Sequence, residues 1–166
     1  MHTRIHLLCA IILALVFSHA AGAEDDISGW GKTKWGMTHA EVNKLYTLDN
    51  WEPGDSTMCR MKDKITIQGH TFVVAFYFDQ RSQKGKLFKV VLVHFNGNRS
   101  KKAWLNEISK MLIEKYGGPT SFEIVENMKI SRWVRPEGEL KLSTVASEKI
   151  MCAIEYLAIR TESQKL

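Results

Sequence analysis

The stretch "TFVVAFYF", residues 71–78, decides the fold because both of its faces are apolar when the chain is extended. Successive side chains of a strand point to opposite faces. One face would carry Phe72, Val74, Phe76 and Phe78, and the other Val73, Ala75 and Tyr77. A strand that is apolar on both faces is usually buried on both sides. We therefore predict that residues 71–78 form a central strand of a sheet.

Other runs rich in β-branched and aromatic residues predict further strands on both sides of this one. The expected strands are residues 64–68, 71–78, 87–95, 121–125, 129–135, 139–145 and 150–158. Residues 79–86 have the polarity of a hairpin loop. Residues 49–62 contain Pro53, Gly54, Asp55 and Ser56, a combination typical of turns, so we predict a loop there.

Two helices are expected. Thr38 and Glu41 have the spacing of a capping box, which predicts a helix from about His39 to Leu48. A longer helix would begin near Ser100 and end at Tyr116, because the sequence Gly-Gly-Pro follows it directly. The element order is then helix, three strands, helix, four strands. It predicts an α+β fold with two helices packed on a largely antiparallel sheet, and it is compatible with two α/β units side by side.

The N-terminal region has the features of a secretory signal peptide. Arg4 precedes a mostly apolar run over residues 5–17, and small residues follow up to Ala23. The run is shorter than the roughly 20 residues of a spanning helix. We predict a signal peptide at 1–23, a flexible leader at 24–29, one domain at 30–160 and a frayed tail at 161–166. The location would be periplasmic or secreted.

Composition limits the partners of the mature chain. The sequence carries 23 basic and 18 acidic residues, and removal of Arg4 with the signal peptide leaves a net charge of +4. The charges are interspersed, so most lysines are expected to be solvated. An exported protein rarely meets nucleic acid, and a partner for the basic clusters would be an anionic lipid head group, a glycan or an acidic protein.

Two cysteines, Cys59 and Cys152, remain after removal of the signal peptide. In an oxidising compartment they permit one intramolecular pairing. We predict a Cys59–Cys152 disulfide.

The residues that could carry catalysis are sparse. His39, His70 and His94 do not lie at helical spacing from one another, and no Gly-x-Ser-x-Gly motif is present. His39 is expected to be exposed and His70 to lie in a turn. We predict a protein without catalytic residues, cofactor or metal. The sharpest metal alternative is the run Met58 to Met61, whose sulfur atoms would suit Cu(I) if Cys59 were reduced.

Tryptophan and arginine are enriched at binding hot spots, and they gather in "SRWVRPEGE", residues 131–139. The candidate binding surface is Trp133, Arg132, Arg135 and Trp51. Burial of Trp133 in the core is the alternative. A ligand carrier would instead use the apolar space beside Phe72, Phe76, Phe78 and Phe88, although these residues also suit an ordinary core.

The segments "KWGMTHAEV" (residues 34–42) and "KYGGP" (residues 115–119) resemble those of small exported bacterial α/β proteins of poorly defined function. The element order is similar to the helix-then-strands unit of SmpA/OmlA-type outer-membrane assembly lipoproteins and of the β-lactamase inhibitor protein. The resemblance implies binding or scaffolding. We therefore expect a non-catalytic module of the bacterial envelope that binds a protein partner, with unknown oligomeric state. The alternative is a carrier of a small apolar or lipidic ligand.

Overall fold

The structure is a computed structural model that describes residues 26–51, 57–95, 103–145 and 151–159. Two helices, α2 (His39–Leu45) and α3 (Ala103–Tyr116), accompany nine strands in these ranges. The strands are β1 (Leu48–Trp51), β2 (Met58–Met61), β3 (Ile65–Ile67), β4 (His70–Phe78), β5 (Leu87–Phe95), β6 (Ser121–Val125), β7 (Met128–Arg135), β8 (Gly138–Val145) and β9 (Met151–Ala158).

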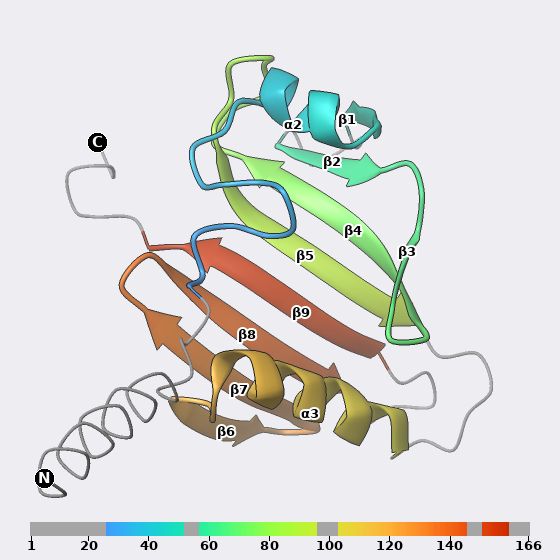
Figure 1. Cartoon of the computed structure of the whole chain (residues 1–166), viewed down its shortest axis with the longest axis vertical. Helices are drawn as coiled ribbons and strands as arrows, with labels where there is room; N and C mark the ends of the chain where they lie inside the picture. The colour runs from blue at the N-terminus through green and yellow to red at the C-terminus, as the bar shows by residue number, and fades with distance from the viewer. Residues whose placement is uncertain (1–25, 52–56, 96–102, 146–150, 160–166) are drawn as a thin grey trace, which may run out of the picture.

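All nine strands belong to one antiparallel sheet (Figure 1). Its order is β1-β2-β4-β5-β9-β8-β7-β6, and β3 pairs with β4 beside β2. After α3, the strands β6 to β9 pair in sequence order. After α2, β1, β2, β4 and β5 are neighbours in that order and β3 pairs only with β4, and the two runs meet where β5 pairs with β9. The first strand of each run, β1 or β6, therefore forms an edge of the sheet.

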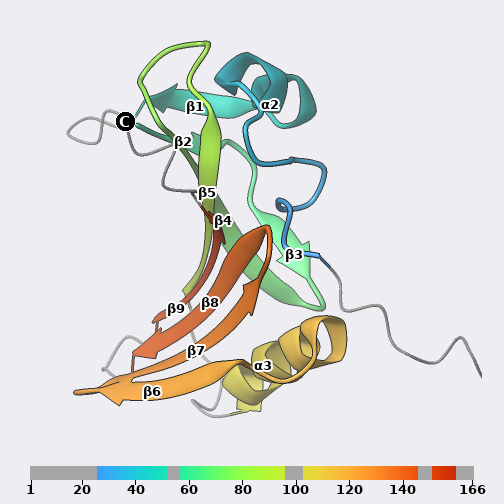
Figure 2. The ribbon, with the colours of Figure 1, turned by 90° about the vertical axis from the view of Figure 1, so that its left-hand side faces the viewer.

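Both helices lie on the same face of the sheet (Figure 2). We call this the helix face, and the opposite one the open face. The segment from Ile27 to Thr38 crosses the helix face between α2 and α3 (Figure 1). Ile27 is fully buried, and the backbone N–H of Trp35 donates to the carbonyl of Ser28. The prediction of a flexible leader is therefore wrong for residues 26–29, because Ile27 belongs to the core.

The central position of residues 71–78 is confirmed. β4 lies between β2 and β5, and its four helix-face side chains, Phe72, Val74, Phe76 and Phe78, have no exposed surface. On its other face Ala75 is also buried, while Val73 and Tyr77 are partly buried.

The N-terminus of α2 has the predicted capping box. The Thr38 hydroxyl accepts from the Glu41 N–H at 3.2 Å, and the Glu41 carboxylate accepts from the Thr38 N–H at 2.7 Å. The helix is shorter than predicted, because Tyr46 is already extended and β1 begins at Leu48. In α3, Trp104, Ile108, Leu112 and Tyr116 are buried. Gly117 follows α3 with φ of 75°, which suits glycine at a helix end.

The predicted α+β fold class is wrong, because the protein contains more strand and less helix than expected. Strands make up 50% of the described residues and the two helices 18%. Part of the difference is at residues 49–62, predicted to be a loop, which overlap β1 and contain β2. These four-residue strands lack the run of β-branched residues by which strands are recognised in a sequence.

The predicted disulfide is also wrong, since Cys59 and Cys152 are both free and buried. The register can be followed across the sheet from β2 to β9: Cys59 is opposite Phe76, Phe76 is opposite Val90, and Val90 is opposite Tyr156. Three interstrand steps of about 4.8 Å separate β2 from β9, and Cys152 is four residues, about 13 Å, from Tyr156. A disulfide needs Cα atoms within about 7 Å. Burial raises the pKa of the Cys152 thiol to about 12, which makes it unreactive.

The predicted signal peptide and the frayed tail lie outside the described residues. Within the described ranges, no helix has both the length and the apolar composition needed to cross a membrane.

Candidate interaction surface at the β6 edge

Two of the four predicted surface residues are structural. Trp133 has no exposed surface, and its indole N–H donates to the Gly117 carbonyl at 2.8 Å. The Arg135 guanidinium donates to the Tyr116 carbonyl at 2.6 Å. Both carbonyls lie at the C-terminal end of α3, so Trp133 and Arg135 attach this helix end to β7. The prediction that Trp133 forms a binding surface is wrong, and its core alternative agrees with the structure.

Arg132 and Trp51 lie far apart in the sheet. Arg132, on the open face of β7, donates to Glu139 at 2.9 Å and to Glu123 at 3.3 Å. The Glu139 hydrogen bond is the main reason why the Arg132 pKa is raised. Trp51, in β1 at the other edge, stacks on His39 at 4.8 Å between ring centroids. The structure therefore does not bring the four predicted residues together.

Exposed apolar side chains instead concentrate at the β6 edge, a surface that the sequence did not reveal. Of the seven large hydrophobic side chains that are exposed in the described part of the chain, three belong to β6 and one to the neighbouring β7. They are Phe122 (58% exposed), Ile124 (62%), Val125 (47%) and Val134 (45%). Every residue of β6 is exposed.

β6 also has a free backbone edge. In the described part of the chain it pairs only with β7, from Ser121 opposite Arg132 to Val125 opposite Met128. Along its outer side, alternate residues therefore present unpaired N–H and C=O groups. Phe122 and Ile124 stand opposite Ser131 and Lys129, on the helix face, while Val125 points to the open face.

A groove of about 430 Å³ lies beside this edge, between α3 and the sheet. Its lining residues come from α3, β6, β7 and β8: Leu105, Asn106, Ser109, Phe122, Lys129, Ser131, Leu142 and Thr144. Lys129 carries the only formal charge among them. The groove is therefore apolar and hydroxyl-bearing, with one cation on β7.

The three described histidines occupy structural positions. His39, predicted to be exposed, is buried and lies 3.0 Å from the Gln83 side chain. His70 begins β4 rather than lying in a turn, and its ring is 3.0 Å from the Glu107 carboxylate. His94 is 2.7 Å from the Thr71 carbonyl. No group of three His, Cys, Asp or Glu side chains in the described ranges could hold a metal ion.

Two further alternatives from the sequence do not fit the structure. In β2, Cys59 is opposite the helix-face residue Phe76, while Met58 is opposite Tyr77 and points to the open face. The Met58 and Cys59 sulfurs therefore point away from each other, which argues against the Cu(I) site. Phe72, Phe76 and Phe78 are fully buried, and Phe88 is half-buried at the irregular pairing between β4 and β5. A ligand could not contact the first three without displacing core side chains.

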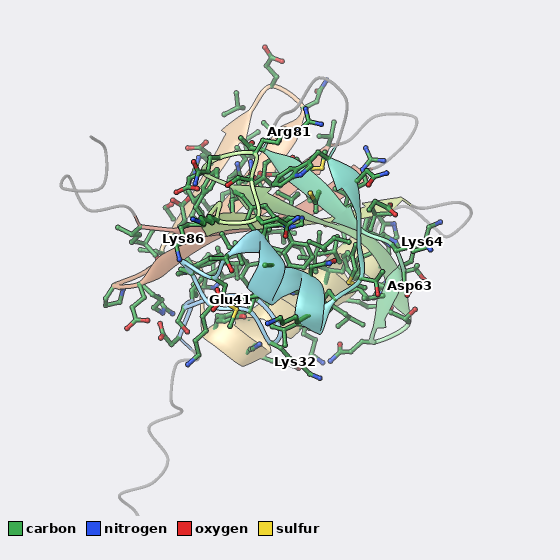
Figure 3. The ribbon with its side chains drawn as sticks, turned by 90° about the horizontal axis from the view of Figure 1, so that it is seen from above. Lys32, Glu41, Asp63, Lys64, Arg81 and Lys86 are labelled. Atoms are coloured by element: carbon green, nitrogen blue, oxygen red, sulfur yellow. The ribbon has the colours of Figure 1, made fainter. Side chains whose placement is uncertain are left out.

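The basic clusters do not form a single-sign face at the α2 end of the molecule. Acidic and basic side chains are mixed there (Figure 3): Lys32, Glu41, Asp63, Lys64, Arg81 and Lys86. Three further basic residues that lie close together in the sequence, Arg99, Lys101 and Lys102, are outside the described residues.

The β6 edge could have been found from the sequence only with the strand order in hand. "SFEIV" reads as an ordinary strand, and its apolar residues look like core until β6 is placed at the end of the sheet. Known proteins give no further guide, because no family model, no curated protein and no solved structure matches this chain.

Proposed function

We propose that this chain is a non-catalytic protein-interaction module of the cell envelope that binds an extended segment of a partner protein along β6. The observation that carries the proposal is the combination of a free strand edge with the largest concentration of exposed apolar side chains in the described residues. Natural edge strands are usually blunted, because an exposed apolar edge readily pairs with another chain. A partner strand would pair with the free backbone edge and also cover the exposed apolar side chains.

The geometry defines what the partner segment should look like. A strand added to β6 would form backbone hydrogen bonds with the outer N–H and C=O groups, and its alternate side chains would share the helix face with Phe122 and Ile124. Apolar residues at these alternate positions would extend the apolar surface of the sheet. Lys129, the single charge in the adjoining groove, favours an acidic residue at one of them.

The envelope location rests on the predicted signal peptide, and the binding role is consistent with the resemblance to small exported proteins. Both remain predictions. For both reasons, the partner should be sought with the full-length protein in its host cell.

The test is photocrosslinking in the host cell, with a photoreactive residue placed at Phe122. Leu45, an exposed apolar residue of α2, provides the matched control at 39% exposure. We expect a discrete protein adduct from position 122 and none from position 45. Adding Ile124→Lys should abolish the adduct, because it places a charge at the apolar edge.

Hydrogen exchange on the complex with the partner so identified tests the strand addition. The amides of residues 121–125 should exchange more slowly in the complex, while those of β1 should be unchanged. Equal adducts at positions 122 and 45, no adduct at position 122, or an unchanged exchange rate in β6 would each contradict the proposal. An adduct with a second copy of this chain would mean that β6 mediates self-assembly and does not bind a different protein.

A further inference from the structure

A second hollow, separate from the β6 edge, lies on the helix face between segments that are far apart in sequence. It is a cleft of about 590 Å³, bounded by residues 26–34, by β3 and by the second half of α3. Clefts that bind small molecules commonly have volumes of about 300–1,000 Å³.

The walls of the cleft are mainly apolar. Trp30 stands on one side, Ile65 and Ile67 of β3 on another, and Met111 and Leu112 of α3 on the third. All five also pack against or belong to the core cluster, so they are held in place by the interior. Tyr116 and Tyr156 contribute further ring surface, with centroids 6.3 Å apart.

The wall that contains Trp30 is fixed by hydrogen bonds. The Thr33 hydroxyl donates to the Trp30 carbonyl at 2.7 Å, and the Lys32 N–H donates to the Tyr46 hydroxyl at 3.0 Å. Gly31 has φ of 58°, and a Cβ atom there would lie 2.5 Å from the Tyr46 hydroxyl oxygen. The positive φ and the close approach to the Tyr46 hydroxyl both favour glycine at this position.

The charged side chains of the cleft are unbalanced. Lys32, Lys34 and Lys115 face a single acid, Asp26, among its lining residues. A hydrogen bond between Asp26 and Glu137 raises the Glu137 pKa, so these two carboxyl groups lie side by side near Lys34, and Glu137 is not among the lining residues. The lysines are exposed, and Figure 3 shows Lys32 projecting outward beside α2. The rim is thus positive above an apolar interior.

We propose that this cleft binds a single-chain amphiphile with an anionic head group. The apolar tail would lie among Trp30, Ile65 and Met111, and the head group would lie at the lysines of the rim. Neutral or cationic amphiphiles with the same tail would lose the electrostatic attraction. The site does not depend on β6, so this inference stands or falls independently of the proposed function.

Fluorescence quenching provides a direct test. A dodecanoate carrying bromine on its tail should quench Trp30 in a saturable manner, and unbrominated dodecanoate should reverse the quenching by competition. Dodecanol and dodecyltrimethylammonium should compete at least about tenfold less well. Trp30→Phe should remove most of the quenching, because it removes the reporter while keeping an aromatic wall.

The lysines are tested with a matched control on the same helix. Lys32→Gln combined with Lys115→Gln should weaken dodecanoate binding about tenfold. Lys110→Gln should leave it unchanged, since Lys110 is exposed on α3, pairs with Glu114 and does not line the cleft. Ile124→Lys, which disables the proposed β6 site, should also leave it unchanged.

Three results would overturn the inference. They are dodecanol competing as well as dodecanoate, quenching without saturation, and quenching that persists in Trp30→Phe. Measuring retention of dodecanoate by the wild-type protein in native mass spectrometry gives a second readout that does not depend on fluorescence. No retained dodecanoate at concentrations that saturate the quenching would likewise count against the site.

Discussion

The two edges of the sheet occupy equivalent places in the topology and differ in how they are protected. β1 is the first strand after α2, and β6 is the first strand after α3. β1 has four residues and an irregular register with β2, and its Leu48 and Trp51 pack against the core. β6 pairs with β7 in continuous register, and each of its five residues is exposed.

This difference shows that topology alone does not leave an edge open. Short length and irregular pairing are common means of blunting an edge strand, and β1 has both. β6 contains neither proline nor lysine, and its one charge, Glu123, is engaged by Arg132. The openness of β6 is thus a property of its sequence, and we expect that a substitution at an exposed β6 residue can remove it without altering the fold.

The largest effect on stability is expected at Trp133, which attaches α3 to the C-terminal half of the sheet. Trp133→Ala would remove a fully buried ring and the hydrogen bond to the Gly117 carbonyl. We expect a loss of about 3–5 kcal/mol in the free energy of unfolding, measured by denaturant titration. Val134→Ala, at the next and exposed position, should change it by less than about 0.5 kcal/mol. Similar losses for the two variants would contradict the placement of Trp133 in the core.

What the sequence could predict depended on local signals. The capping box at Thr38, the helix end at Gly117 and the two-faced strand at 71–78 are each determined by neighbouring residues, and all three are found in the structure. Alternation along β7 places Trp133 and Arg132 on opposite faces, but alternation alone cannot tell which face the helices cover.

The remaining features depend on which strands become neighbours. A count of two cysteines indicates a pair only if the register brings them together, and here Cys59 lies level with Tyr156 instead. The cleft combines residues 26–34, 65–67 and 111–116, which no single stretch of sequence connects. The β6 edge requires the order of the whole sheet.

The two cysteines provide the next test of stability, because Cys59 lies in β2, in the N-terminal half of the sheet, and Cys152 lies in β9, in the C-terminal half. Cys59→Ala and Cys152→Ala should each cost about 1 kcal/mol, since each removes a buried group of roughly methyl size. Their effects should add within about 0.5 kcal/mol in the double variant, because the sites are distant. A disulfide would instead make the double variant no less stable than either single one, and reductant would destabilise the wild type.

A similar effect, confined to the N-terminal half, is expected from the α2 capping box. Thr38→Ala should cost about 1 kcal/mol in the free energy of unfolding. It should also speed hydrogen exchange in α2 and in β1, which follows it, more than in β6. Equal acceleration at the two edges would show that α2 does not protect β1 selectively.

The capping box also predicts a pH dependence. The hydrogen bond from the Thr38 N–H, followed by that from its hydroxyl, lowers the Glu41 pKa below 4.5. This stabilisation is present above the unfolded-state pKa and is lost as the pH falls through the folded-state pKa. Glu41→Gln should therefore be less stable than wild type at neutral pH, and the difference should shrink in acid. Glu126→Gln, in the exposed turn between β6 and β7, serves as the control. A stability difference between Glu41→Gln and wild type that persists at low pH would contradict the assignment.

The smallest change in stability is expected at the β6 edge itself. Ile124→Lys replaces an exposed side chain, so the free energy of unfolding should change by less than about 0.5 kcal/mol. Any concentration-dependent association of the purified protein should nevertheless decrease, because a lysine on an edge strand opposes pairing with another chain. Sedimentation velocity over a range of concentrations measures this separately from stability.

Asn50→Lys makes the same test on β1, where the residue is also exposed. If the two edges differ as the structure indicates, this substitution should leave association unchanged, since β1 is already blunted by its length and irregular pairing. Equal decreases from both substitutions would mean that the added charge acts by general repulsion rather than at a particular edge. A decrease from Asn50→Lys alone would reverse the comparison and transfer the proposed binding edge to β1.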